Sequence, residues 1–233
     1  MDLDDAFPGR SLAVVGAGGK KTTLYALATA RDRAVLTSTV RIPPFRETVR
    51  SLVTEDPVAA LEGPFPLGLA AEDEGDRLRG YDPAVVDDLI DAHAGSVLVK
   101  ADGARTRLLK APAEHEPRLP ERVDTVVPVA SVRAVGEPLT DEHVHRPERV
   151  AEVTGLSPGD ELGGEDVARV LASPEGGLKR VPDGARVVPL VNMADTERLA
   201  DTARTIARRV HDRADVEQVV VARMDRAEIV DVV

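Results

Sequence analysis

A glycine-rich turn between a strand-like and a helix-like segment constrains this chain more than any other feature. The apolar run Leu12–Val15 leads into Gly16-Ala17-Gly18-Gly19-Lys20-Lys21-Thr22-Thr23, and a helical pattern, Leu24–Ala28, follows directly. Glycines let backbone N–H groups turn toward an anion, and the N-terminus of the following helix adds a favourable dipole. We therefore expect a strand, loop and helix that bind the phosphates of a nucleotide.

The position of lysine in this loop leaves two assignments open. The common phosphate-binding loop has lysine six residues after its first glycine, whereas Lys20 and Lys21 lie four and five residues after Gly16. Lys21 is slightly favoured, because the residue after it, Thr22, can ligate Mg²⁺. The spacing of Lys20 resembles the compact Gly-x-x-Gly-Lys loops of Mur-ligase-like nucleotide sites. A plain turn that uses glycine only for tight geometry is the alternative. The predicted nucleotide-binding residues of the loop are Gly16, Gly18, Gly19, Lys20, Lys21, Thr22 and Thr23.

The charge composition narrows the class of protein. The net charge is −11, and only five of the 30 basic residues are lysine: Lys20, Lys21, Lys100, Lys110 and Lys179. An acidic chain poor in lysine and aromatic residues is typical of a salt-adapted organism. Nucleic acid is an unfavourable partner for it, because binding phosphodiesters needs a basic face. Four of the five lysines lie near the best motifs, which indicates that they serve the chemistry.

Other features of the composition indicate a cytoplasmic location. The chain has no cysteine, which excludes disulfides, thiolate metal sites and a cysteine nucleophile. No stretch of eighteen apolar residues is present, so we expect no membrane span. The acidic start Met1–Asp5 lacks the basic-then-apolar layout of a signal peptide.

Alternating strand and helix patterns predict a single α/β domain over residues 1–233. The expected strands are 11–16, 34–39, 96–102, 124–130, 186–192 and 217–222, and the expected helices are 20–31, 83–93, 141–153, 164–172 and 195–212. This order favours a three-layer P-loop NTPase-like fold with a mainly parallel central sheet. Residues 41–80 are richer in proline, glycine and acids, and we expect an insertion there with one short strand at 66–70. The end of the chain, near 219–230, predicts an edge hairpin.

A second motif ends another expected strand. Val97–Lys100 is apolar up to its last residue, and Asp102-Gly103 follows it shortly afterwards. In phosphate-loop proteins an acid at such a strand end holds Mg²⁺ directly or through water, so Thr22 and Asp102 are the predicted metal ligands, and Lys21 and Asp102 the predicted catalytic residues. A simple Asp-Gly turn is the alternative.

Charged residues after this strand are weaker candidates for substrate binding. They are Lys100, Arg105, Lys110, His115 and Glu116, and two prolines hold the last two in a defined loop. A solvated loop is the simpler interpretation of this segment. His143 and His145 invite a metal site, but the helical pattern of 141–153 would separate them, and we expect hydrogen-bonding roles instead.

A third motif, Asn192-Met193-Ala194-Asp195, follows the strand pattern at 186–192. GTP-binding proteins use Asn-Lys-x-Asp at such a strand end, where the aspartate accepts hydrogen bonds from guanine. Here Met193 replaces the lysine that covers the base. Asn192 and Asp195 are therefore predicted to contact the base, whereas Asp195 as a plain helix N-cap is the alternative.

Taken together, the motifs resemble those of the YqeC family. The resemblance covers nearly the whole chain and runs through the glycine loop, Leu36–Thr39, Ala101–Ala104, Leu109–Pro112, His115–Pro117, Val144–Glu148 and Leu190–Asp195. It is most specific between Asp102 and Pro117. Three departures are the additional lysine in the glycine loop, Lys100 in place of a glutamate, and Met193 in place of a lysine. The missing glutamate weakens the case for magnesium more than the case for nucleotide.

The resemblance implies an accessory protein in the maturation of a selenium- or molybdenum-containing hydroxylase cofactor. The leading hypothesis is a protein that binds ATP or GTP with Mg²⁺ and acts as a slow NTPase or phosphoryl-transfer enzyme, with the hydroxylase or its cofactor as partner. A small-molecule kinase or Mur-like ligase, in which Arg105, Arg107 and Lys110 hold an anionic acceptor, is one alternative. A non-catalytic partner protein with a degenerate nucleotide site is the other. Because the chain has no cysteine, it cannot carry selenide or sulfide on a thiol.

Overall fold

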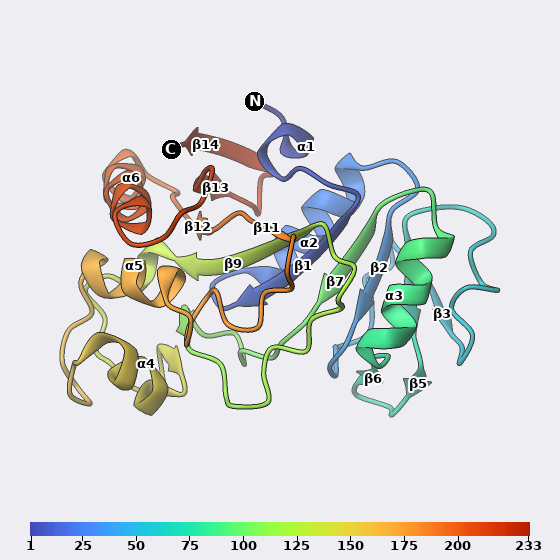
Figure 1. Cartoon of the computed structure of the whole chain (residues 1–233), viewed down its shortest axis with the longest axis horizontal. Helices are drawn as coiled ribbons and strands as arrows, with labels where there is room; N and C mark the ends of the chain where they lie inside the picture. Colours follow the sequence, from blue (N-terminus) through green and yellow to red (C-terminus); the bar gives the residue numbers. More distant parts are fainter.

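The computed structural model describes residues 1–233 as a mainly parallel sheet covered by helices on both faces (Figure 1). The helices are α1 (Leu3–Ala6), α2 (Lys20–Ala30), α3 (Pro83–Ala92), α4 (Pro147–Thr154), α5 (Gly164–Ala172), α6 (Glu197–His211) and the 3-10 helix η1 (Val132–Ala134). The strands are β1 (Ser11–Gly16), β2 (Val35–Ser38), β3 (Arg50–Val53), β4 (Leu67–Ala70), β5 (Glu72–Asp73), β6 (Leu78–Arg79), β7 (Val97–Lys100), β8 (Leu109–Lys110), β9 (Thr125–Ser131), β10 (Val144–His145), β11 (Arg186–Val187), β12 (Leu190–Asn192), β13 (Val220–Arg223) and β14 (Glu228–Val232).

The main sheet has ten strands in the order β14-β13-β12-β9-β1-β7-β2-β4-β3, and β11 also pairs with β9. All pairs are parallel except the closing hairpin β13–β14. The carboxyl ends of β1, β7, β9 and β12 therefore meet at one edge of the sheet. This confirms the predicted α/β fold with a mainly parallel sheet, and the terminal hairpin.

The core lies in two layers, one on each face of the sheet. Even-numbered positions of β1, such as Leu12 and Val14, pack with Leu24 and Leu27 of α2. Odd-numbered positions such as Ala13 face α3 on the opposite side. Farther along that second face, α4, α5 and α6 form a separate group beside β12 and β13 (Figure 1). The central strands are apolar on both faces because helices cover both, as parallel sheets require.

Residues 41–80 contribute two strands to one edge of the main sheet. The predicted strand at 66–70 is β4, which pairs with β2 and with β3 (Arg50–Val53). The small antiparallel pair β5–β6 follows. The segment therefore supplies more strands than its proline- and glycine-rich sequence indicated, and it extends the sheet at the β3 edge.

Two predicted elements differ from the structure. The helix expected over 141–153 is wrong in its first half, because Val144–His145 forms β10 beside β8 and α4 begins only at Pro147. Proline favours the first position of a helix, and Arg146 before it has a left-handed backbone (φ 64°) that separates strand from helix. The strand expected over 186–192 divides into β11 and β12 around Pro189, which has no N–H to donate.

No helix of the chain combines the length and the apolar character that a bilayer crossing requires.

Candidate functional site

The glycine loop connects β1 to α2 at the carboxyl edge of the sheet and packs tightly against the ends of two neighbouring strands. Gly18 (φ 83°) and Gly19 (φ 123°) have left-handed backbones, which glycine adopts without strain. A Cβ atom on Gly18 would overlap the backbone nitrogen of Ser131, and one on Gly19 would overlap the side-chain nitrogen of Asn192. The loop therefore needs glycine for close approach as well as for its backbone angles.

The N–H groups of this loop divide into a paired half and a free half. Gly16 donates to Asp102 Oδ2 (2.9 Å), Ala17 to the carbonyl of Val129 (2.9 Å) and Gly18 to the carbonyl of Arg107 (2.8 Å). The next four N–H groups, those of residues 19–22, have no partner in the protein. They belong to the first turn of α2, where the helix dipole favours negative charge. The loop therefore presents four consecutive free donors.

The two lysines of the loop point in different directions. Lys20, the first residue of α2, is buried, and its Nζ donates to the carbonyl of Gly16 and lies 2.9 Å from Asp102 Oδ1. Lys21 is exposed and forms no ion pair. The ammonium group that closes the inside of the loop is thus that of Lys20, whereas Lys21 lies at its mouth.

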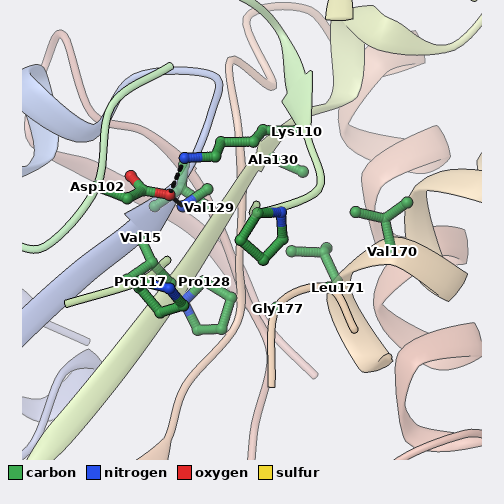
Figure 2. A pocket seen from close by; sticks show the side chains of 13 residues that line it. Val15, Asp102, Lys110, Pro117, Pro128, Val129, Ala130, Val170, Leu171 and Gly177 are labelled. Carbon is green, nitrogen blue, oxygen red and sulfur yellow. Dashed lines mark hydrogen bonds and ion pairs between the residues drawn. The ribbon is translucent and has the colours of Figure 1, made fainter. Parts of the chain in front are cut away.

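Asp102 lies at the centre of a buried ionic cluster. Its Oδ2 is 2.9 Å from Lys110 Nζ, which also contacts Glu116 Oε2 (2.8 Å) and donates to the carbonyl of Gly103 (2.5 Å). Arg146 reaches Glu116 Oε2 from the other side (2.7 Å). All three N–H donors of Lys110 therefore have partners inside the protein. Figure 2 shows Lys110 extended toward Asp102 above the end of the Val129 strand.

Charge in this cluster is unbalanced in favour of cations. Its cationic side chains are those of Lys20, Lys100, Lys110 and Arg146, and its carboxylates are those of Asp102 and Glu116. Burial alone would raise the pKa of Asp102, but Lys20 and Lys110 lower it below its ordinary value. Burial lowers the pKa of Lys20. Burial, reinforced by Lys20, lowers the pKa of Lys100 to about 7, and its Nζ has only the carbonyl of Arg41 as a partner (3.2 Å).

Behind Asp102 and Lys110 lies a small cavity of about 10 Å³, shown in Figure 2. Its far wall is apolar and comes from Pro117, Pro128 and Leu171. Such a volume holds at most one water molecule. This cavity therefore has no room for a phosphate group.

The remaining predicted substrate residues lie apart from the buried cluster. Arg105 and His115 are exposed, and Arg105 has a left-handed backbone (φ 45°). His145, unlike His115, is half-buried beside the cluster, and burial together with Arg146 lowers its pKa to about 4. His143 lies 3.3 Å from Glu137 Oε2. No group of three or more His, Cys, Asp or Glu side chains is placed to hold a metal ion.

The Asn192–Asp195 motif lies on the other side of the loop. Asn192 is buried and joins two segments, because its Nδ2 donates to the carbonyl of Gly18 (2.9 Å) and its Oδ1 accepts from the N–H of Met224 (3.1 Å). The N-cap of α6 is Thr196, whose Oγ1 accepts from the N–H of Leu199 (3.3 Å). The simpler reading of Asp195 as the N-cap is therefore wrong, and its side chain instead pairs with Arg133.

Two oxygen atoms of the predicted metal ligands have no hydrogen bond in the protein. Asp102 Oδ1 makes none of acceptable geometry even though Lys20 Nζ is near, and no hydrogen bond is formed by the half-buried Thr22 hydroxyl. Magnesium needs only one or two protein oxygens and completes its shell with water and phosphate oxygens, so either residue alone fits the ion, although the structure places the two in different pockets.

Sequence reasoning missed several residues of the site. Arg146 and Arg133, which hold Glu116 and Asp195, received no role, because arginine is common in this chain and neither stands in a phosphate-loop motif. The scarcity of lysine was a usable signal. Three of the five lysines lie in one buried cluster.

Comparisons with known proteins place the chain in a family. The sequence model described as YqeC protein matches residues 12–148, which include the glycine loop, Asp102, Lys110, Glu116 and Arg146 but not Asp195. A protein of Escherichia coli (strain K12), described as uncharacterized protein YqeC, is 32% identical over 194 residues, which cover 78% of this chain and 75% of that relative. No solved structure matches. On both findings, this chain belongs to the YqeC family.

Proposed function

We propose that this protein binds ATP or GTP with Mg²⁺ at the loop Gly16–Thr23 and acts as a slow NTPase or phosphoryl-transfer enzyme. The observation that carries the proposal is the row of four free N–H groups at residues 19–22, at the N-terminus of an 11-residue helix. Backbone donors that converge at a helix N-terminus bind phosphate oxygens, and no side chain of the protein occupies them here.

The charge of the neighbouring cluster supports a polyanionic ligand. Its cations outnumber its two carboxylates, Asp102 and Glu116, and an unpaired buried ammonium is costly. A triphosphate close to Lys20 would offset this excess. It would also favour the protonated form of Lys100, whose pKa burial has lowered to about 7.

Each residue has a distinct role in this proposal. The N–H groups of residues 19–22 bind phosphate oxygens, Lys20 supplies positive charge from inside the loop, and Lys21 supplies it from the mouth. The Thr22 hydroxyl, or Asp102 directly or through water, would hold Mg²⁺, which when bound neutralises charge on the phosphate oxygens. Asp102 also fixes the loop through the N–H of Gly16.

The wider role that we propose is in maturation of a selenium- or molybdenum-containing hydroxylase cofactor. Its support is the family resemblance alone. The absence of cysteine favours a nucleotide-driven or scaffolding role over transfer of sulfur or selenium on a thiol.

A second candidate function is a non-catalytic partner whose nucleotide site serves stability. The observation that favours it is that Asp102 already contacts two lysines, at 2.9 Å each, so its charge is neutralised before any metal arrives. Measurement of phosphate release separates the two, because a nucleotide that stabilises the fold without turnover supports the partner function.

The test is calorimetric titration of ATP and GTP, with and without Mg²⁺, at low salt and in molar salt. We expect Lys20→Ala and Lys21→Ala each to weaken binding at least tenfold, about 1.4 kcal/mol. Lys179→Ala is the matched control, because Lys179 pairs with Glu175 away from the loop. Unchanged affinity in both single variants and in the double variant would show that the phosphate assignment is wrong.

A further inference from the structure

An open pocket of about 300 Å³ lies beside the free end of the glycine loop. It is lined by Thr22, Arg133, Asn192, Met193, Asp195, Asp225 and Arg226. Thr22 belongs to both features, since its N–H is one of the four free donors and the residue lines the pocket. A molecule whose phosphates occupy the loop therefore has this pocket next to it.

The pocket offers both acceptors and donors for hydrogen bonds. Asp195 Oδ2 accepts from Arg133, and its Oδ1 has no partner. Asp225 and Arg226, just after β13, are exposed and form no ion pair. The charges of two aspartates and two arginines balance in this lining, so the pocket suits an uncharged part of the ligand that carries N–H donors better than it suits more phosphate.

Within the Asn192–Asp195 motif, Asn192 is occupied by a structural role, which leaves Asp195 as the polar group that can contact a base. Asn192 uses its amide to join Gly18 to Met224, which holds the loop and the pocket in one arrangement. Met193 is the apolar member of the lining, and a thioether offers a soft surface for an aromatic ring. Asp195 has no capping duty, because Thr196 caps α6.

We propose that this pocket binds the guanine base of a nucleoside triphosphate, with Asp195 accepting hydrogen bonds from N1–H and the 2-amino group, and with Arg133 donating to O6. The proposal rests on the proposed function of the loop. Side by side, Arg133 and Asp195 present a donor followed by two acceptors, and the Watson–Crick edge of guanine presents an acceptor followed by two donors. Adenine has one donor and a lone pair on that edge, so it satisfies fewer of these groups.

Two further charged residues that line the pocket, Asp225 and Arg226, are exposed. Neither is engaged elsewhere, so they are free to contact the base edge or the ribose. Neither belongs to the sequence motif of Asn192 and Asp195. They join it only because β12 and β13 are adjacent parallel strands whose carboxyl ends meet.

The experiment compares binding of GTP, ATP, ITP and XTP to the full chain by calorimetry. We expect GTP to bind at least tenfold more tightly than ATP, and ITP, which lacks the 2-amino group, to fall between them. In Asp195→Asn the amide offers a donor where the carboxylate accepted, so GTP binding weakens at least tenfold and XTP, with a carbonyl at position 2, binds more tightly than GTP. Asp201→Asn, an exposed position on α6, is the matched control and leaves the order of affinities unchanged.

The outcomes separate this inference from the proposed function. Equal affinity for ATP and GTP, or an Asp195→Asn variant that keeps the wild-type order, overturns the guanine assignment while leaving the phosphate loop intact. Absence of binding by every triphosphate overturns both. If Asp195→Asn is unstable, Arg226→Ala at an exposed and unpaired position serves instead, and a loss of GTP affinity with unchanged melting temperature supports the pocket. An unchanged GTP affinity in Arg226→Ala together with equal affinity for ATP and GTP counts against it.

Discussion

Removing the negative charge of Asp102 is the sharpest test of how the buried cluster is held together. Asp102→Asn keeps the shape of the side chain, but it deprives Lys20 and Lys110 of a carboxylate that each contacts at 2.9 Å. Asp102 is 1% exposed, so water cannot replace the lost partner. Breaking a buried ion pair by removing one partner costs about 3–5 kcal/mol. That is a large share of the roughly 5–15 kcal/mol by which a typical domain is stable.

The assay is urea unfolding at pH 7 followed by circular dichroism, with the free energy of unfolding extrapolated to water. We expect Asp102→Asn to lose about 3 kcal/mol or more, with an unchanged dependence on urea. Asp88→Asn is the control, because Asp88 is exposed and unpaired, and it should change stability by about 0.5 kcal/mol at most. An Asp102→Asn protein within about 1 kcal/mol of wild type would refute the view that this carboxylate holds the lysines in place.

Three further predictions concern local geometry and pH. Gly18→Ala should lower the free energy of unfolding by about 1–3 kcal/mol more than Gly136→Ala does, measured by thermal unfolding. Both glycines have positive φ, but a Cβ on Gly18 meets backbone atoms, whereas a Cβ on Gly136 meets nothing within 4 Å. Equal losses in the two variants would contradict the close approach at Gly18. Thr196→Ala should destabilise α6 by about 1 kcal/mol through loss of its N-cap, and Asp195→Ala measured in parallel should not, so the reverse order would count against the cap assignment. The pKa of His145 is lowered to about 4 from 6.5, so as the pH falls the unfolded chain takes up this proton before the folded chain does. The stability that the neutral ring contributes is therefore full above pH 6.5 and is lost as the pH falls toward 4. His145→Gln should make the free energy of unfolding decline less steeply over this pH range.

The adjacency of the loop and Asp102 was predictable, because it follows from topology. Two strands that end in polar motifs, if parallel and adjacent, bring those motifs together, and β1 and β7 are such a pair, with Val14 opposite Lys100. The Asp102 carboxylate therefore meets the N–H of Gly16 directly. The family and the α/β fold were equally accessible, since both depend on motifs and on the alternation of strand and helix patterns.

The direction of the loop lysines was not predictable from the pattern. Neighbouring residues at the start of a helix point about 100° apart, so the inward one is decided by the residue at which α2 begins. The helix begins at Lys20, which turns that side chain toward Asp102 and leaves Lys21 in solvent. Similarly, nothing local to Lys110 signals its burial, because its partners Asp102 and Glu116 come together only when the chain folds.

The sequence also did not predict the pocket residues that follow separate strands. Arg133 follows β9 and Arg226 follows β13, and neither belongs to a motif. Only the strand order places them around Asp195. Residues 41–80 show the same limit, because a strand at a sheet edge needs few apolar residues and β3 is mostly exposed.

The unequal exposure of the lysines has a practical consequence. Lys20, Lys100 and Lys110 are buried and Lys179 is partly covered, which leaves Lys21 as the one exposed lysine. An acylating reagent under mild conditions should therefore mark this protein at Lys21 and at its terminal amine, with little labelling elsewhere. Peptide mass mapping of the label on Lys21 then reports whether the mouth of the loop is accessible, without any assay of turnover.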